Sequence, residues 1–392
     1  MNDTTPPASP PTSRRNRDDN VFSRLTSGTV TNYSNNPDRG VIVPFTGRAL
    51  YDKHSPLVCT HVAEGHSRAV LSVAATNDVM FTGSKDCTAK IWDLHTGQEI
   101  QSLPEHPDSV VVVRYNEFNR LAFSVSKSFI KVWDPRDNPA RCIKILSSSG
   151  LAATSTQSTT SITSKGPDLA PGENKILDIQ LSLYGTTLFS TCGNIVRVWD
   201  LRMFYCVGKL NTGHQAPIMC MCVEEAGIDN NLVITGSKDH YIKAFEVMEG
   251  VGGIHNPKLT CTPPHYDGIE ALVVNGDQLF SASRDACIKK WDLSRPNNKL
   301  VQSLNQAHKD WIQALGFTNN NNTLVSGCRS GFIKLWATDT CQLIGDIKAH
   351  SMAIHSIDTN ASLVFTASAD NTIGFWRWKS SCEPSPEYND DS

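Results

Sequence analysis

The segment TGSKDCTAKIWD, residues 82–93, joins two short apolar runs through a polar turn and ends on Trp-Asp. It contains Ser84 and Asp86, and His66 lies upstream, so the three residue types of a hydrolytic triad are present. Almost the same phrase returns as TGSKDHYIKAFE at residues 235–246. A nucleophilic serine normally occurs once, on a strained elbow such as GxSxG, which this sequence lacks. The repetition therefore favours a structural unit over a catalytic site.

Weaker copies of this phrase continue along the chain. They end on seven aromatic residues: Trp92, Trp133, Trp199, Phe245, Trp291, Trp336 and Trp376. The spacing is 40 to 46 residues, except for 66 residues between Trp133 and Trp199. Most copies also begin with a histidine, at His66, His106, His214, His265, His308 and His350. Short alternating apolar runs lie between these markers, as in strand–turn–strand units.

A repeat of this length with Gly-His and Trp-Asp markers resembles the WD-repeat family, whose fold is a β-propeller with four strands per blade. Seven copies predict an all-β, seven-bladed WD-repeat β-propeller over residues 56–379. The last copy stops after its third strand, while an unused apolar run, PLVCTHVA, precedes His66. We predict that this N-terminal strand completes the last blade and closes the ring, which leaves no long sheet edge open.

Three segments lie outside the repeat. Residues 1–55 are rich in Pro, Ser, Thr, Asn and Arg and are expected to be mostly disordered, although VIVPFTG is a candidate for packing on the ring. Residues 380–392 form a short acidic tail, also expected to be disordered. Residues 147–172 form a Ser/Thr-rich insertion in the third unit. This insertion is either a tolerated polar loop or an arm controlled by phosphorylation.

Composition narrows the classes of function. Hydrophobic residues make up 39% of the 392 residues and the formal net charge is -3, which favours neither nucleic acid nor a membrane as partner. There is no apolar run of membrane-spanning length and no secretory h-region. The 12 cysteines form no CxxC pair, so we expect buried thiols in a reducing cytoplasm rather than a metal site. No nucleotide-binding or zincin motif is present, so we predict no enzyme activity and no cofactor. We also predict that the ring is monomeric.

The resemblance to WD repeats implies a role for the triad-like residues. In that family the leading His, the Ser, the Asp and the Trp of a unit form a buried hydrogen-bond chain. Ser and Trp side chains suit this role, since a buried indole N–H needs an acceptor that a hydroxyl can provide. The expected sets are His66–Ser84–Asp86–Trp92, His265–Ser283–Asp285–Trp291 and His350–Ser368–Asp370–Trp376, with a shorter set, His214–Ser237–Asp239, ending on Phe245.

Three units depart from this pattern. Lys127, Gly193 and Ser330 are aligned with the Asp position, and the third unit also lacks the leading His. We therefore expect blades two, three and six to be less tightly tied.

The residue just before the Asp position is expected on one face of the propeller. In chain order these residues are Lys85, Ser126, Cys192, Lys238, Arg284, Arg329 and Ala369. Lys127, and Arg68 and Lys309 after their leading histidines, add cations, while Tyr266 and Trp311 add aromatic rings of a kind enriched at binding hot spots. The alternative is that the charges are ordinary solvated turn residues and that Trp311 packs in a strand.

A closer resemblance concerns the whole ring. The phrases LYDKHSPLVCTHVAEGH, PPHYDGIEAL and AHKDWIQAL, together with the insertion AATSTQSTTSITS, resemble the C-terminal propeller of the long kinesin-4 motors that pause microtubule growth. The resemblance implies a tail domain that binds tubulin or microtubules, in the cytoplasm and associated with the cytoskeleton. The motor domain is absent from this sequence.

The basic face and this resemblance lead to one hypothesis. Tubulin exposes acidic C-terminal tails, and a ring of Lys and Arg would attract them and be weakened by salt. A second hypothesis is a generic adaptor for an acidic or phosphorylated peptide, in ubiquitin ligation, trafficking or cargo binding. It predicts a short linear ligand and no affinity for microtubules.

Overall fold

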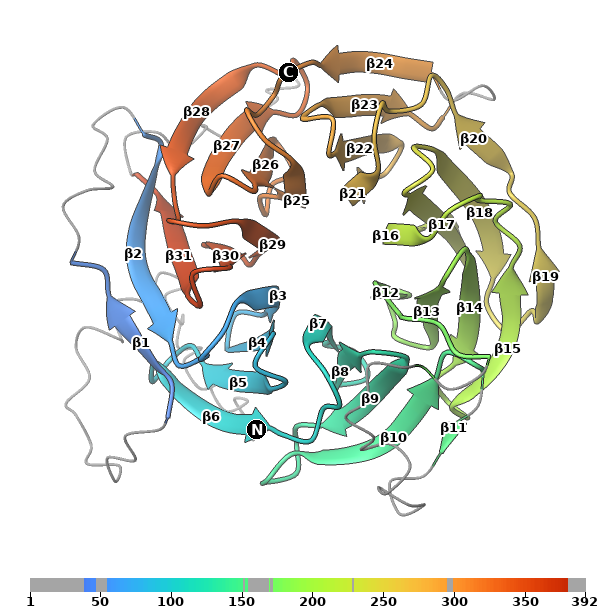
Figure 1. Cartoon of the computed structure of the whole chain (residues 1–392), viewed down its shortest axis with the longest axis horizontal. Helices are drawn as coiled ribbons and strands as arrows, with labels where there is room; N and C mark the ends of the chain where they lie inside the picture. Colours follow the sequence, from blue (N-terminus) through green and yellow to red (C-terminus); the bar gives the residue numbers. More distant parts are fainter. Residues whose placement is uncertain are drawn as a thin grey trace, which may run out of the picture.

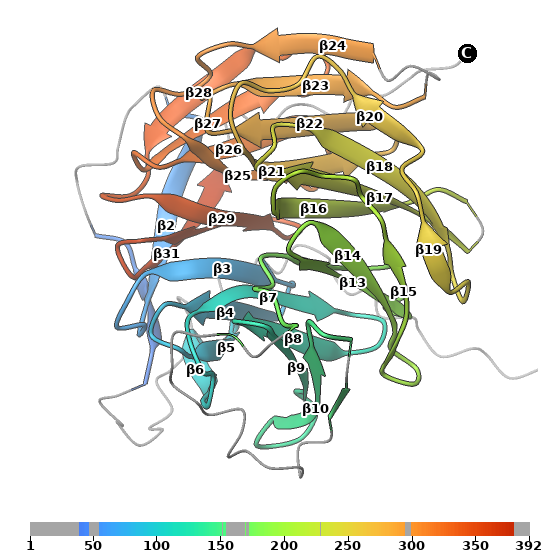
Figure 2. The same cartoon turned by 45° about the vertical axis from the view of Figure 1, so that its right-hand side comes forward.

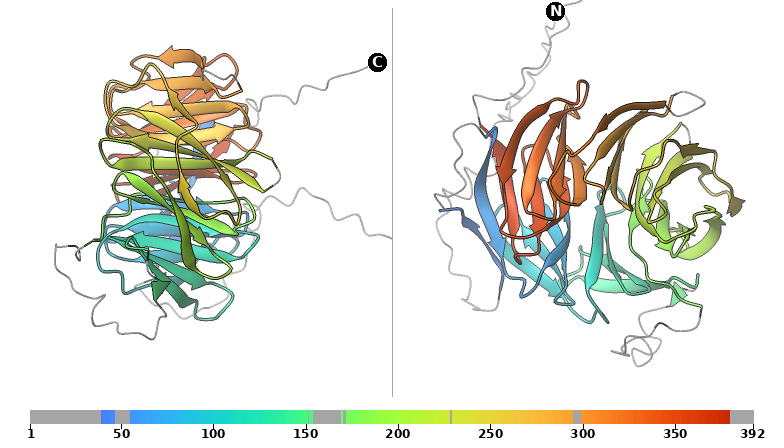
Figure 3. Two further views of the ribbon diagram at one scale, coloured as in Figure 1. Left: turned by 90° about the vertical axis from the view of Figure 1, so that its right-hand side faces the viewer. Right: turned by 45° about the horizontal axis from the view of Figure 1, so that its top comes forward.

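The computed structural model describes residues 39–46, 55–150, 152–153, 169, 172–227, 229–294 and 299–379. Its strands form seven radial blades around a central channel, with the chain running once around the ring (Figure 1). In each blade the first strand lines the channel and the fourth lies outside. The blades pack face to face around the ring (Figure 2), and edge-on the ring is a thick disc (Figure 3). The predicted all-β propeller is confirmed.

Blade one contains β3 (Val70–Ala75), β4 (Val79–Ser84), β5 (Ala89–Asp93) and β6 (Gln98–Leu103). Blade two contains β7 (Val110–Asn116), β8 (Leu121–Ser126), β9 (Phe129–Asp134) and β10 (Arg141–Ser147). Blade three contains β12 (Ile179–Leu181), β13 (Thr187–Cys192), β14 (Ile195–Asp200) and β15 (Tyr205–Leu210). Two short strands extend the second and third sheets at their outer edges: β11 (Ala152–Ala153) pairs with β10, and β19 (Gly253–His255) pairs with β15.

Blade four contains β16 (Ile218–Glu225), β17 (Asn230–Ser237), β18 (Ile242–Met248) and β20 (Leu259–Cys261). Blade five contains β21 (Ile269–Asn275), β22 (Gln278–Ser283), β23 (Ile288–Asp292) and β24 (Lys299–Leu304). Blade six contains β25 (Ile312–Phe317), β26 (Thr323–Cys328), β27 (Phe332–Ala337) and β28 (Leu343–Lys348). Because β19 lies between β18 and β20 in sequence, the fourth blade ties itself to the third on its way to its own outer strand.

Blade seven closes the ring with both ends of the described chain. It contains β29 (Ile354–Thr359), β30 (Val364–Ser368) and β31 (Ile373–Trp378), and its fourth strand is β2 (Leu57–Glu64), which pairs antiparallel with β31. The predicted closure by an N-terminal strand is therefore confirmed. Strand β1 (Val41–Pro44) then pairs with β2 and touches β6, so blades seven and one form one continuous sheet.

Strand β1 lies in the segment VIVPFTG, which the sequence indicated as a candidate for packing on the ring, and it packs there. Gly40 donates its N–H to the carboxylate of Glu99 at 2.7 Å, and that carboxylate also forms a buried ion pair with Lys90. A Cβ at Gly40 would lie 2.4 Å from the indole of Trp92, so only glycine fits there. Residues 1–38, 47–54 and 380–392 and most of the insertion lie outside the described residues.

The glycine near the end of the second strand has a packing reason in three blades. A Cβ added at Gly83 would lie 2.8 Å from the side chain of Val110 on the next blade, and Gly236 and Gly327 face Ile269 and Ile354 in the same way. The absence of a side chain lets each second strand approach the inner strand of its neighbour. The apolar core then fills the spaces between blades, and Trp92, Trp199, Trp291 and Trp376 are among its largest fully buried side chains.

Candidate functional site

The leading histidine of blade one is held between a carboxylate and a hydroxyl. His66 Nδ1 lies 2.8 Å from Asp86 Oδ2, and His66 Nε2 lies 2.8 Å from Thr82 Oγ1. The indole N–H of Trp92 donates to the same threonine at 2.9 Å. The equivalent chains in other blades are His265–Ser281–Trp291 and His350–Thr366–Trp376, with Asp285 and Asp370 on the other side of the imidazole.

The serines assigned to this chain by sequence are not the partners of the tryptophans. Ser84 Oγ accepts the N–H of Asp86 and donates to the carbonyl of Arg68. Ser237, Ser283 and Ser368 accept the N–H of their own Asp in the same way. Ser84 is two residues beyond Thr82 on the same strand, which places it roughly 7 Å farther along and out of reach of the indole.

The true acceptor has a signal that sequence reasoning missed. A hydroxyl residue occupies this strand position in all seven units: Thr82, Ser124, Ser190, Thr235, Ser281, Ser326 and Thr366. Six of these hydroxyls accept an indole N–H. In blade four, where Phe245 replaces the tryptophan, Thr235 Oγ1 contacts His214 and donates to the carbonyl of Lys243.

The alignment of two of the three departing units, those of blades two and three, is also corrected. In blades two and three the turn between the second and third strands has only two residues, because Ser126 pairs with Phe129 and Cys192 with Ile195. Ser126 is therefore the counterpart of Ser84, and the turn has no Asp position for Lys127 or Gly193 to occupy. Blades two and six nevertheless keep a His–Ser–Trp chain through Ser124 and Ser326.

The order carboxylate, imidazole, hydroxyl is that of a hydrolytic triad, but its environment is not. Thr82 and Trp92 are 0% exposed, and the threonine oxygen already receives the indole proton. No substrate could reach that oxygen without opening the blade. The arrangement instead gives hydrogen-bond partners to the imidazole, the hydroxyl and the indole of the blade, and it fixes the turn against the preceding loop.

In the hydrogen-bond chain of blade five, the carboxylate of Asp285 stays ionised at neutral pH. Burial opposes ionisation of Asp285, but hydrogen bonds from His265, Tyr266 N and Cys287 N prevail and lower its pKa to about 2. Desolvation lowers the pKa of His265, so the neutral imidazole donates from Nδ1 to Asp285.

Asp285→Ala is expected to lower the free energy of unfolding by about 2–3 kcal/mol, because three donors lose their buried acceptor. Chemical denaturation monitored by tryptophan fluorescence measures the change. Asp277→Ala, at an exposed turn of the same blade, is the matched control. Equal stability of Asp285→Ala and the wild type would refute the structural role of the chain.

Stability is expected to fall as the pH drops from 7.5 to 5. Burial lowers the pKa of both His106 and His308 to about 3, so the folded chain binds fewer protons than the unfolded chain below pH 6.5. Buried Asp358, whose pKa is raised to about 6, acts in the opposite direction for one proton. The net loss for these groups is about 2–3 kcal/mol. Calorimetry at both pH values tests this, and His308→Gln should flatten the dependence; an unchanged melting temperature would contradict it.

One end of the ring, here called the top end, carries the second turns of the blades and the loops that lead into the inner strands. In five blades the residue after the Ser position donates its N–H to the loop before the inner strand: Lys85 to Ala69, Lys238 to Pro217, Arg284 to Gly268, Arg329 to Trp311 and Ala369 to Ala353. Ser126 and Cys192 are instead buried at the ends of their strands, so the prediction that they point to this face is wrong.

Three blades bring cations and an aromatic ring into one continuous group at the top end. The guanidinium carbons of Arg284 and Arg329 lie 4.7 and 4.8 Å from the ring centroid of Trp311. Lys238 and Arg284 both border Gly268, since a Cβ added at that glycine would lie 3.4 Å from Lys238 Cα and 3.9 Å from Arg284 Cδ. We call Lys238, Arg284, Trp311 and Arg329 the Trp311 arc.

The charges of the arc are not equally available. Arg284 donates to the carboxylate of Glu270 on the inner strand β21 and is largely covered. Lys238 and Arg329 are exposed, and neither forms an ion pair with a described residue. Tyr266, 86% exposed, stands on the loop before the same blade. The arc therefore presents two available cations beside a partly exposed indole.

The other predicted residues lie on several blades: Arg68 and Lys85 on blade one, Lys127 on blade two and Lys309 on blade six. Lys85, Arg68 and Lys309 are exposed, and Lys127 is half-buried in its short turn with φ 52. The same loops also carry acidic residues: Glu64, Glu105, Asp108, Glu173, Asp267 and Asp310. The top end is therefore of mixed charge, and its available cations belong mainly to the turns.

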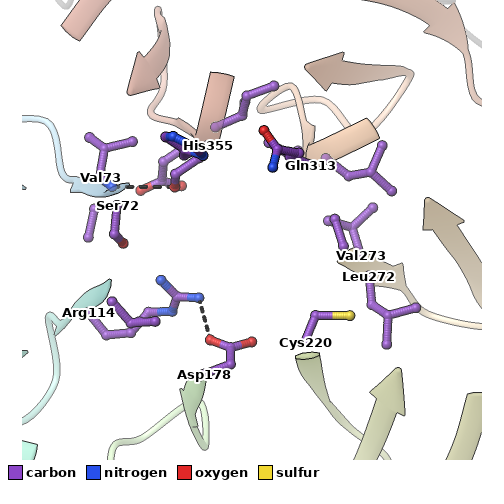
Figure 4. A pocket seen from close by; sticks show the side chains of 18 of the residues that line it. Ser72, Val73, Arg114, Asp178, Cys220, Leu272, Val273, Gln313 and His355 are labelled. Carbon is purple, nitrogen blue, oxygen red and sulfur yellow. Dashed lines mark hydrogen bonds and ion pairs between the residues drawn. The ribbon is translucent and has the colours of Figure 1, made fainter. Parts of the chain in front are cut away.

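The central channel contains a cavity of about 630 Å³ lined by the inner strands (Figure 4). Arg114 Nη2 and Asp178 Oδ1 are 3.0 Å apart, and the second oxygen of Asp178 accepts the N–H of Met221 from the next blade. Asp358 accepts the N–H of Ala75 in the same manner. These side chains tie blade to blade. No group of three potential metal ligands occurs among the described residues.

Comparison with known proteins agrees with this geometry. The family profile described as "WD domain, G-beta repeat" matches residues 57–93, 204–246, 298–337 and 341–377. This chain carries WD40 repeats. The first two matched segments end at Trp92-Asp93 and just after Phe245, and the last two end just after Trp336 and Trp376, so the profile follows the aromatic markers of the blades.

The WD40 chain also resembles parts of longer proteins. It is 47% identical to human kinesin-like protein KIF21B over 95% of this chain, and 46% identical to human kinesin-like protein KIF21A over 91%. It is 35% identical to kinesin-like protein klp-12 of Caenorhabditis elegans over 81%. The chain covers 23%, 22% and 20% of these proteins. It is homologous to the C-terminal region of KIF21A and KIF21B. Among the described residues, no helix is long and apolar enough to cross a bilayer.

Proposed function

We propose that this WD40 propeller is a non-catalytic binding domain of a kinesin-like protein of the kinesin-4 type, and that its top end binds tubulin or microtubules. In this role it contributes to the regulation of microtubule growth, in the cytoplasm and on the cytoskeleton. The Trp311 arc is the observation that carries the proposal. It combines two cations that lack described ion-pair partners with an aromatic ring, on loops held by a rigid scaffold.

The chemistry of the arc favours an acidic, flexible ligand. Carboxylates of a tubulin tail would pair with Lys238 and Arg329, while Trp311 provides an apolar platform for the chain between them. Lys85, exposed on blade one at the same end, extends the cationic surface across the channel mouth. The acidic loop residues around the arc would hinder a broad anionic surface and favour a narrow peptide that reaches the turns.

The same chemistry would also accept another acidic or phosphorylated peptide, as an adaptor would. Pelleting of the chain with microtubules over a salt series distinguishes the two. We expect the bound fraction to decrease steadily between about 50 and 200 mM salt, since exposed charge pairs are screened over this range. No binding at the lowest salt concentration would refute the microtubule proposal and favour the adaptor.

A further inference from the structure

The end of the ring opposite the Trp311 arc, here called the bottom end, carries an unusual set of exposed apolar side chains. Six of them follow one another over blades two to four: Phe118, Leu183, Tyr184, Met203, Met248 and Val251. Their exposed fractions run from 46% to 70%. They lie in the first and third turns of their blades, which the antiparallel order of the strands places at the bottom end. We call these six residues the apolar strip.

Contacts between the turns make the strip continuous. The rings of Phe118 and Tyr184, from blades two and three, meet edge to face at 5.3 Å. Asn119, in the same turn of blade two as Phe118, also donates to the carbonyl of Gly185, which follows Tyr184 in blade three. From there Thr186 donates to Glu249 of blade four at 2.7 Å. Met248 and Val251 then line a shallow depression together with Arg202, the neighbour of Met203.

The strip is not an ordinary consequence of folding. Single exposed apolar residues are common, but a continuous series that joins three blades is typical of an interaction site. Its turns are fixed by hydrogen bonds: Asn116 Oδ1 accepts from Phe118 N, and Asp200 holds Arg202 through two contacts at 3.2 and 2.7 Å. The apolar side chains are therefore presented on a preorganised surface, which reduces the entropy cost of binding.

Charge indicates what kind of partner fits. Glu117, Glu225 and Asp229 border the strip, are exposed and form no ion pair with a described residue. Two exposed arginines lie in the same turns. Arg202 is paired with Asp200, and Arg120, near Phe118, forms no ion pair with a described residue, so three carboxylates face one available guanidinium. The available charge around the strip is therefore negative. A partner that buries the strip must supply apolar side chains together with Lys or Arg beside them.

We propose that the bottom end is a second interaction surface, which binds an amphipathic helix of a partner protein with basic residues flanking its apolar face. Such a helix would place its apolar side on Phe118, Tyr184 and Met248 and its cations near Glu117, Glu225 and Asp229. This surface is separate from the Trp311 arc, so one propeller can hold two partners at once.

The test uses a fluorescein-labelled Leu/Lys peptide designed as an amphipathic helix, with a Leu/Glu peptide of the same pattern as comparison. We expect the full chain to bind the Leu/Lys peptide at least tenfold more tightly in fluorescence polarisation. The double variant Tyr184→Ser/Met248→Ser is expected to weaken that binding at least tenfold. Val301→Ser, which removes an exposed apolar side chain from the outer strand β24, is the matched control and should bind as the wild type does.

Three results would overturn the proposal. They are equal binding of the two peptides, undiminished binding by the double variant, and the same loss in Val301→Ser as in the double variant. Self-association that the double variant abolishes, without peptide binding, would assign the strip to a second copy of the chain instead. The replaced side chains are exposed, so the variants should fold, and unchanged melting temperatures will show that they do. Met203→Ser is a further single variant of the apolar strip.

Discussion

Replacing Trp291 with alanine is expected to lower the free energy of unfolding by about 4 kcal/mol. The indole is 0% exposed and fills the core between blades four and five, where it packs among residues such as Ile269 and Leu279. Its Nε1 donates to Ser281 at 2.9 Å, and that serine also holds His265. The substitution therefore leaves a large cavity and breaks the hydrogen-bond chain of the blade. Denaturant unfolding of wild type and variant measures the loss.

Trp291→Phe separates the two contributions. Phenylalanine keeps most of the apolar volume and removes only the N–H donor, so we expect a smaller loss of about 1–2 kcal/mol. Blade four is the natural precedent, because Phe245 occupies this position there and is 0% exposed. Equal losses for Trp291→Ala and Trp291→Phe would show that the hydrogen bond dominates. A loss below about 1 kcal/mol for alanine would contradict the assignment of Trp291 to the core.

Reversing Lys85, Lys238 and Arg329 to glutamate together is expected to weaken microtubule binding on the order of a hundredfold at low salt. These three cations are exposed at the top end, so their replacement should leave the fold intact. Each glutamate would replace an attraction to a tail carboxylate with a repulsion. Pelleting with increasing microtubule concentration gives the dissociation constants.

The control for this triple variant has the same change in net charge. Arg141, Lys299 and Arg377 are exposed on the strands β10, β24 and β31, away from the turns of the top end. Their reversal to glutamate should reduce binding less than threefold if contacts at the top end matter. Similar losses in both triple variants would mean that only net charge is sensed and that the top end is not the binding surface.

The sequence was sufficient to predict the ring because each blade repeats the same signals. A buried aromatic and a polar turn recur in all seven units, a leading histidine recurs in six, and the missing fourth strand of blade seven is visible as the apolar run before His66. The role of the second strand's hydroxyl was not predicted. Thr82 was overlooked because Ser84, two residues on, has the same chemistry and lies closer to the conspicuous Asp86.

Other parts of the site depend on geometry that no pattern contains. A turn shortened in blades two and three moves Ser126 and Cys192 from the expected surface into the core. The contact of Trp311 with Arg284 and Arg329 joins residues of neighbouring blades, so it could not be read from either repeat alone. The fit of Gly40 against Trp92 and Glu99 could not be predicted either, because it joins the segment before β1 to the strands β5 and β6 of blade one.

The most direct test of the proposed function compares intact microtubules with microtubules whose acidic tubulin tails have been removed by limited proteolysis. The central claim is that the Trp311 arc binds these tails. We expect the chain to pellet with intact microtubules at low salt and to remain in the supernatant with tail-less ones. Equal binding to both would contradict the claim, whatever the effect of the charge reversals.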